Sequence, residues 1–237
     1  MPYVYQQYHR RKLPHIHAPG ATIFVTFRLA GSIPQSVLEE WRQEKIWLEK
    51  EIQKTTRLSQ QNASELDHSR DELALNFHRR WFVRFEDILH QEACGPMWMK
   101  DARIADLIAD SLHYRDGKEY RLDVFCIMSN HVHAVFAPLL NDASLQVVPQ
   151  SFPLRFISSL PTLSAIMQSL KGYTAHEANK ILQRTGQFWE VESYDHQIRN
   201  DNSHERIIKY VLNNPVKAGL VKDWRDWKWN YQRKSDC

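Results

Sequence analysis

The apolar stretch YRLDVFCIMSNHVHAVFA, residues 120–137, constrains the fold more than any other part of this chain. Its composition predicts two β-strands that meet near Ser129–Asn130. Side chains two residues apart in a strand point to the same face of the sheet. His131 and His133 therefore share one face of the second strand, and the apolar residues that alternate with them share the other.

Two imidazoles about 7 Å apart along a strand can hold a single metal ion when both turn toward it. The alternative is that His131 and His133 are two unrelated histidines on a sheet face. A ligand pair needs a third ligand, and no residue adjacent to the pair in the sequence offers one. The third ligand is therefore sought on another element.

A predicted helix contains candidates for that third ligand. In SLKGYTAHEANK, residues 169–180, Tyr173 and Glu177 are four residues apart, which places them one turn apart on one helix face. A carboxylate in this position can bind the ion that prepares the target of the tyrosine. Asn179 and His176 are nearby alternatives. The competing interpretation is a helix that packs its apolar side inward and carries Tyr173 at its edge.

The remaining periodicity predicts further strands and helices. Residues 22–30 alternate between apolar and polar side chains, which is typical of a strand, and residues 35–91 are interpreted as two long helices in an antiparallel hairpin. The other predicted elements are helices over 101–113, 164–184 and 203–213, the last capped by Asn202 with Glu205 and ended by Asn214–Pro215, a strand over 187–199, and a loop over 143–163.

Composition narrows the class of protein. With 237 residues, 43% hydrophobic and 25% charged, the chain fits one globular domain with an insertion. Its net charge is only +3, so local basic clusters must carry any interaction with nucleic acid. Three cysteines without close spacing favour neither a zinc ribbon nor a disulfide framework, and fit a reducing cytoplasm. We expect no signal peptide and no membrane span.

Basic residues mixed with aromatic ones are candidates for DNA contacts, because cations neutralise phosphates and aromatic rings stack on unpaired bases. The alternative for the C-terminal tail, residues 216–237, is that its tryptophans cap the core while its cations are solvated. The candidates are Arg10, Arg11 and Lys12 near the N-terminus, Arg79, Arg80 and Arg84 on the second long helix, Lys171, His196, and Arg225 and Lys228 in the tail.

Several motifs in order carry a resemblance to a known family. MSNHVH follows the strand YRLDVFCI and is itself followed by SLKGYTAHEANK, FWEVESYDHQIRN and IIKYVLNNPVKAGLV. This series resembles the single-tyrosine HUH transposases, and more closely the subgroup associated with repetitive extragenic palindromes (REP). The likeness extends to RRKLPHIHAPGATIFVTFRLAGSIP and GPMWMKDARIADLIADSL, and so to most of the chain.

The resemblance implies a fold and a site. The fold is α+β, with a ferredoxin-like central antiparallel sheet and helices on one face, forming a single domain over 1–237 that the helical hairpin at 35–91 interrupts. His131 and His133 would hold Mg²⁺ or Mn²⁺ together with Glu177, although related sequences often carry Asn or Gln as the third ligand. Two imidazoles by themselves favour zinc, copper or nickel, whereas oxygen ligands shift the preference toward Mg²⁺ or Mn²⁺.

The resemblance also implies a reaction, with Tyr173 as the nucleophile. The enzyme would cut single-stranded DNA beside an imperfect hairpin, join the 5′-phosphate to the tyrosine and free a 3′-hydroxyl. Free tyrosine has a pKa of about 10, so about one phenol in a thousand is ionised at neutral pH, and activation is required. The alternatives are a metal-dependent phosphodiester hydrolase that activates water, and a non-catalytic binder of hairpin DNA. Either a monomer or a homodimer is expected.

Overall fold

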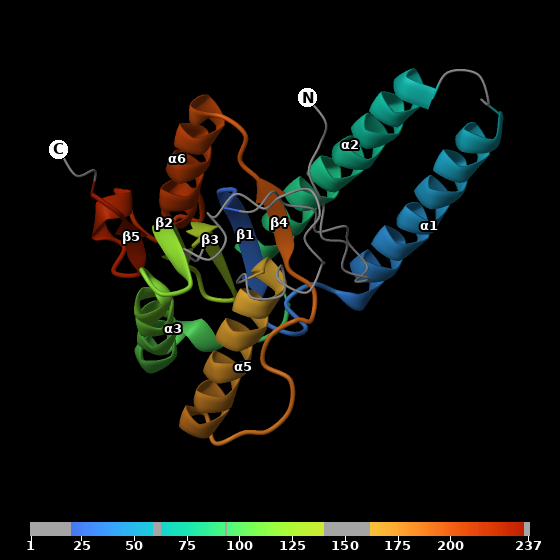
Figure 1. Ribbon diagram of the computed structural model, residues 1–237. Coiled ribbons are helices and arrows are strands. Elements are labelled where there is room, and N and C mark those ends of the chain that lie inside the picture. Colours follow the sequence, from blue (N-terminus) through green and yellow to red (C-terminus); the bar gives the residue numbers. More distant parts are fainter. Residues whose placement is uncertain (1–19, 59–62, 93, 140–161, 235–237) are drawn as a thin grey trace, which may run out of the picture. The chain divides into compact units, whose positions relative to one another are not determined.

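The computed structural model describes residues 20–58, 63–92, 94–139 and 162–234 (Figure 1). Two compact units divide the chain: Met1–Ala30 joins Met97–Cys237 in one unit, and Gly31–Pro96 forms the other. The predicted basic cluster at residues 10–12 and nearly all of the predicted loop at 143–163 lie outside the described residues. In the described ranges, no helix combines the length and the apolar character needed to cross a membrane.

The first unit is built on a five-stranded antiparallel sheet. Its strands are β1 (Ile23–Arg28), β2 (Tyr120–Ile127), β3 (His131–Pro138), β4 (Tyr194–Gln197) and β5 (Asn230–Gln232). Their spatial order is β4-β1-β3-β2-β5. The first four strands have the order and alternation with helices of a ferredoxin-like fold, and β5 extends the sheet beyond β2. The predicted α+β class is confirmed.

Two helices cover one face of this sheet, α3 (Ala102–Arg115) and α5 (Leu163–Ile181) (Figure 1). They pack on the apolar side of β3, since Val132 and Phe136 belong to the same buried cluster as Ile108 of α3 and Leu170 of α5. The alternation predicted for β3 therefore holds, and the imidazoles of His131 and His133 point to the face that α3 and α5 leave open.

Helix α6 (Asp201–Lys217) lies on that second face of the sheet. The Tyr210 ring meets the Phe24 ring of β1 edge-on at 6.0 Å between centroids. Nearer its start, His204 Nε2 lies 2.9 Å from the Asp123 carboxylate, at a bulge in β2. The expectation of helices on one face thus describes α3 and α5, and α6 adds a layer on the side of the histidines.

The predicted ends of this helix were wrong. Its N-cap is Asn200, whose Oδ1 accepts from Ser203 N at 2.8 Å, rather than Asn202. The helix also continues past Asn214–Pro215 to Lys217. Proline cannot donate to the carbonyl four residues earlier, that of Val211. The Asn214 side-chain amide donates to the Tyr210 carbonyl at 2.9 Å and also lies 3.4 Å from the Val211 carbonyl, so it partly replaces the missing donor.

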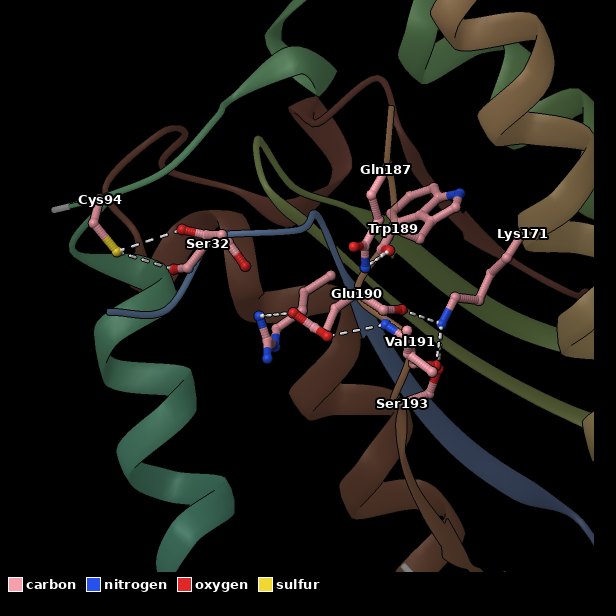
Figure 2. A network of polar contacts seen from close by, with 10 residues as sticks. Ser32, Cys94, Lys171, Gln187, Trp189, Glu190, Val191 and Ser193 are labelled. Carbon is pink, nitrogen blue, oxygen red and sulfur yellow. Dashed lines mark hydrogen bonds and ion pairs between the residues drawn. The ribbon is translucent and has the colours of Figure 1, made fainter. Parts of the chain in front are cut away.

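The strand predicted over 187–199 is shorter than expected. It consists of β4, four residues long, preceded by an isolated bridge between Trp189 and Leu29. Between them the backbone is outside the sheet, and Lys171 Nζ binds the carbonyls of Glu190, at 2.5 Å, and Val191, at 2.9 Å (Figure 2).

The second unit contains α1 (Gln35–Leu58) and α2 (Ala63–His90). The two helices run antiparallel, since Glu40 pairs with Arg84 and Glu44 pairs with Arg80 four residues earlier. The two ends of the unit approach closely near Gly95, whose φ is +78° and where a Cβ atom would lie 2.3 Å from the Gly31 carbonyl oxygen. Only glycine fits this position.

Candidate metal and nucleophile site

The imidazoles of His131 and His133 converge on β3. Their Nε2 atoms lie 3.0 Å apart, and both side chains are buried. Each ring is held by its other nitrogen: His131 Nδ1 lies 2.7 Å from Asn130 Oδ1, and His133 Nδ1 lies 2.8 Å from Thr26 Oγ1. Both rings are therefore oriented by polar groups of the sheet, with their Nε2 atoms directed at a common point.

The proton positions follow from these partners. Asn130 Oδ1 only accepts, so His131 donates through Nδ1 and presents a lone pair at Nε2. When His133 likewise donates through Nδ1 to Thr26, the Nε2 lone pairs of both histidines face each other. A cation bound by both Nε2 atoms would remove the repulsion between these lone pairs. When His133 instead donates through Nε2, Thr26 donates to its Nδ1. The first arrangement is that of metal-ligating histidines, whose second nitrogen normally donates to a fixed acceptor.

The strand register shows which side chains of the neighbouring strands share the face of the two histidines. Thr26 and Arg28 of β1 lie directly opposite His133 and His131, respectively, so all four side chains share one face of the sheet. In the next strand, β4, Tyr194 lies opposite Thr26. The histidines thus stand in a polar region of a sheet whose other face is apolar.

A tyrosine from α6 completes the region. The Tyr210 ring lies 5.5 Å from the His133 ring, centroid to centroid. Sequence reasoning missed this residue, although it lies in IIKYVLNNPVKAGLV, one of the motifs that carry the resemblance. Its position four residues before Asn214 puts both residues on one side of α6, but the spacing does not say whether that side faces the sheet.

The predicted nucleophile lies elsewhere. Tyr173 is 52% exposed on α5, the helix that covers the apolar face of the sheet, and its ring lies 6.0 Å from the guanidinium carbon of Arg115. Because His131 and His133 point to the opposite face, the structure does not bring Tyr173 to them.

The predicted third ligand is also engaged on α5. Glu177 accepts from Lys180 Nζ at 2.8 Å, and this hydrogen bond lowers the pKa of the Glu177 carboxyl. Among the described side chains, no group of ligand atoms within 4.8 Å of one another contains Glu177. Of the alternatives, His176 lies 3.7 Å from Glu177, and Asn179 accepts from Arg184 at 2.6 Å. The structure brings together the histidine pair but none of these three residues with it.

The predicted DNA-binding residues differ in their exposure and in their interactions with the rest of the protein. On α2, Arg79 is exposed, whereas Arg80 and Arg84 pair with acids of α1. Lys171 binds the 190–193 segment. His196 lies opposite Phe24 and so shares the face of the metal pair.

The tail is largely structural. Trp227 Nε1 donates to the Ile127 carbonyl at 3.0 Å, and Trp229 Nε1 donates to Asp106 at 2.9 Å. Lys228 pairs with the same Asp106, at 2.9 Å, and Arg225 pairs with Asp223, also at 2.9 Å. Of the two interpretations of the tail, packing therefore describes Trp227 and Trp229.

The fold and the histidine pair define a ferredoxin-like domain with a candidate metal site on its sheet, and comparison with known proteins adds a sequence relationship. No family model matches the chain. A Haemophilus influenzae protein with the provisional name REP-associated tyrosine transposase is 25% identical over 105 residues, which cover 44% of this chain and 54% of the relative. The resemblance predicted from the motifs is confirmed, over a smaller part of the chain than expected.

Two further matches were found. An uncharacterized Haemophilus influenzae protein is 27% identical over 103 residues, 41% of this chain and 56% of the relative. The chain thus spans about half the length of the curated relatives it matches. A solved structure of a REP-associated tyrosine transposase bound to a REP hairpin aligns with a TM-score of 0.48 at 12% identity, over 97% of this chain and 82% of that chain.

Proposed function

We propose that this protein is a transposase that cuts and rejoins single-stranded DNA beside hairpins, with Tyr210 as its nucleophile. The observation that carries the proposal is the position of Tyr210 against His133, on the same sheet face as the converging imidazoles. The name of its relative supports the reaction class. Tyr210 replaces Tyr173 in this proposal because α6, and not α5, lies over the histidines.

The Tyr210 oxygen attacks the scissile phosphorus and forms a P–O bond, while the bond from phosphorus to the 3′-oxygen breaks. The phenolic proton leaves the tyrosine through solvent, and the departing 3′-oxygen takes up a proton to become a hydroxyl. The downstream DNA stays attached through its 5′-phosphate, so its bond energy is kept for rejoining. Attack by a free 3′-hydroxyl reverses these changes.

The donor set fits a divalent metal ion. His131 and His133 would hold Mg²⁺ or Mn²⁺ through their Nε2 atoms, and Asn130 and Thr26 would keep the rings in place. When bound, the ion polarises a phosphoryl oxygen and positions the scissile group. Oxygen atoms of water and DNA phosphate would provide its other ligands, as is usual for Mg²⁺. Glu177, Asn179 and His176 would join only after a movement of α5, so we assign no ligand there.

One chain holds all these groups in its first compact unit. We therefore propose that a monomer suffices for cleavage. Among the predicted basic residues that the structure describes, we propose His196, on the face of the histidine pair, and Arg79, exposed on α2, as contacts for the DNA backbone. Cys94 and Cys126 are not joined in a disulfide, which suits a reducing cytoplasm, where we propose the protein acts.

The test uses purified protein, Mn²⁺ and a pool of oligonucleotides, each with an imperfect hairpin between randomised single strands. One half of the pool is labelled at the 3′-end and the other at the 5′-end. A phosphotyrosine intermediate predicts that the 3′ label migrates with protein on a denaturing gel, while the 5′ label is released on a fragment with a 3′-hydroxyl.

Two other outcomes would replace the proposal. Cleavage with neither label on the protein would identify a metal-dependent hydrolase. Retention of hairpins on a native gel without cleavage of either label would identify a binding protein. A parallel incubation with EDTA separates metal-dependent cleavage from contamination, because chelation must abolish both the adduct and the fragment.

A further inference from the structure

Asn230, the first residue of β5, stands in the same row of the sheet as one histidine of the pair. It lies opposite Cys126 of β2, and Cys126 in turn lies opposite His133 of β3. Residues directly opposite each other in an antiparallel sheet project from the same face, so the Asn230 side chain points to the side on which α6 lies. The row therefore places an amide beside the helix that carries Tyr210.

The Asn230 amide ties two segments to the edge of the sheet. Its Nδ2 atom donates to the Leu212 carbonyl of α6 at 2.9 Å and to the Trp224 carbonyl of the short helix η3 (Trp224–Asp226), also at 2.9 Å. A primary amide has two N–H donors, and these two bonds use both. The Oδ1 atom is buried, and among the described residues it has no hydrogen-bond partner. Such an acceptor costs free energy and is uncommon in a native structure, so packing alone does not explain this side chain.

The bond from Asn230 fixes α6 close to the phenol, because Leu212 is two residues beyond Tyr210. The start of the helix has an anchor of its own, since His204 Nε2 lies 2.9 Å from a buried carboxylate of β2. Between these two contacts, the Tyr210 ring lies 5.5 Å from the His133 ring. Hydrogen bonds on both sides of the tyrosine therefore resist sliding and rotation of the helix over the sheet.

Resting on the proposed function, we infer that Asn230 is a positioning residue that holds Tyr210 in place for attack on the scissile phosphate. Loss of the amide would remove the polar anchor nearest to the phenol, and the apolar contacts that remain are not directional. A misplacement of about 1 Å can slow a reaction by about 10²-fold. The unpartnered Oδ1 fits this role, because functional positions keep features that stability alone would not favour.

A neighbouring residue provides a matched control. Trp229→Phe removes the bond from the indole Nε1 to Asp106 of α3, a contact that does not involve α6. Asn230→Ala removes both amide bonds, and Asn230→Asp keeps the shape but turns an acceptor-only carboxylate toward two carbonyls. For each variant we measure the rate of adduct formation at saturating hairpin DNA, the Mn²⁺ affinity by calorimetry, and the thermal unfolding.

A further measurement reports on the phenol itself and requires no cleavage. Fluorotyrosine labels all nine tyrosines, and the fluorine resonance of Tyr210 is the one that Tyr210→Phe removes. We expect this resonance to shift in Asn230→Ala and in Asn230→Asp, and to stay at the wild-type position in Trp229→Phe.

The expected result is adduct formation slowed by about 10- to 10²-fold in Asn230→Ala, and by more in Asn230→Asp. Mn²⁺ affinity should stay within about threefold of wild type, because Asn130 and Thr26 orient the imidazoles and both remain in place. Trp229→Phe should form the adduct within about threefold of wild type, even where its unfolding temperature falls as far as that of Asn230→Ala.

Equal slowing in Asn230→Ala and Trp229→Phe, with equal shifts in unfolding temperature, would overturn the inference in favour of a general effect on stability. A Tyr210 resonance that stays in place in Asn230→Ala would also overturn it. So would an unchanged adduct rate in Asn230→Ala alongside loss of the adduct in Tyr210→Phe, and in that case the proposed function stands. If the wild type forms no adduct, the proposed function fails, and the fluorine shift still decides whether Asn230 fixes the position of Tyr210.

Discussion

The phenol ring of Tyr210 lies 5.5 Å from the imidazole of His133, and the two residues come from α6 and β3, 77 positions apart in the sequence. This contact is the basis of our proposal that the nucleophile lies on α6. We predict that Tyr210→Phe lowers adduct formation by a factor on the order of 10³ or more, since it removes the attacking atom. Tyr173→Phe is the matched control and should cleave within about threefold of wild type. A gel on which Tyr173→Phe loses the adduct and Tyr210→Phe keeps it would refute this assignment.

The same contact predicts cleavage in cis. A mixture of Tyr210→Phe with a His131→Ala, His133→Ala double variant should stay inactive, because each chain lacks one half of the site. Recovery of about a quarter or more of the wild-type adduct in the mixture would instead show that two chains exchange their tyrosines. Sedimentation of the mixture with DNA reports whether the two variants associate at all.

The Thr26 hydroxyl orients the ring of His133, which we propose as a metal ligand. Thr26→Val keeps the shape but removes the oxygen that His133 Nδ1 contacts at 2.8 Å. We expect Mn²⁺ affinity to fall by about 10- to 100-fold, the usual cost of losing such an orienting partner. Thr26→Ser retains the hydroxyl and should bind Mn²⁺ like wild type. Titration calorimetry measures both, and equal affinities in Thr26→Val and Thr26→Ser would remove Thr26 from this role.

Alkaline pH should unfold the protein through Tyr120. Burial raises the pKa of the Tyr120 phenol, which donates to the Leu112 carbonyl at 2.8 Å. The folded state therefore keeps a proton that the unfolded state loses above about pH 10, and stability falls as the pH rises through that range. Tyr120→Phe should cost about 1 kcal/mol at pH 8 and then show a weaker decline from pH 9.5 to 11.5. Urea unfolding at each pH measures both effects, and parallel declines in the two proteins would contradict the prediction.

We expect the C-terminal tail to contribute more to the stability of the fold than to DNA binding. Trp229→Phe removes the indole donor that Asp106 accepts at 2.9 Å, while the ring stays apolar. We expect the free energy of unfolding to fall by about 1 kcal/mol. Hairpin affinity, measured by fluorescence anisotropy where the variant is fully folded, should change by less than about twofold. A large loss of hairpin affinity with unchanged stability would show instead that Trp229 contacts DNA.

The apolar composition of residues 120–137 was sufficient to predict the hairpin of β2 and β3. The side-chain period of a regular strand is two, so His131 and His133 were expected on one face of their strand, and the register of β3 with β1 agrees. Helix ends were harder to predict. The continuation of α6 through Pro215 depends on the Asn214 amide reaching a carbonyl, which no local propensity describes.

The sequence by itself determined that a paired-histidine face exists and which family it resembles. Only the tertiary structure decided which tyrosine meets that face. Both α5 and α6 carry a tyrosine, and helical periodicity does not say on which side of a sheet a helix packs. The strand order decides which face each helix covers. Helix α3 leads from β1 to β2 and α5 leads from β3 to β4, so the two connections cross the sheet in opposite directions. Because β1 and β3 are also antiparallel, right-handed connections put both helices on one face. Helix α6 runs from β4 at one edge to β5 at the other, and the same handedness places it, with Tyr210, over the histidines.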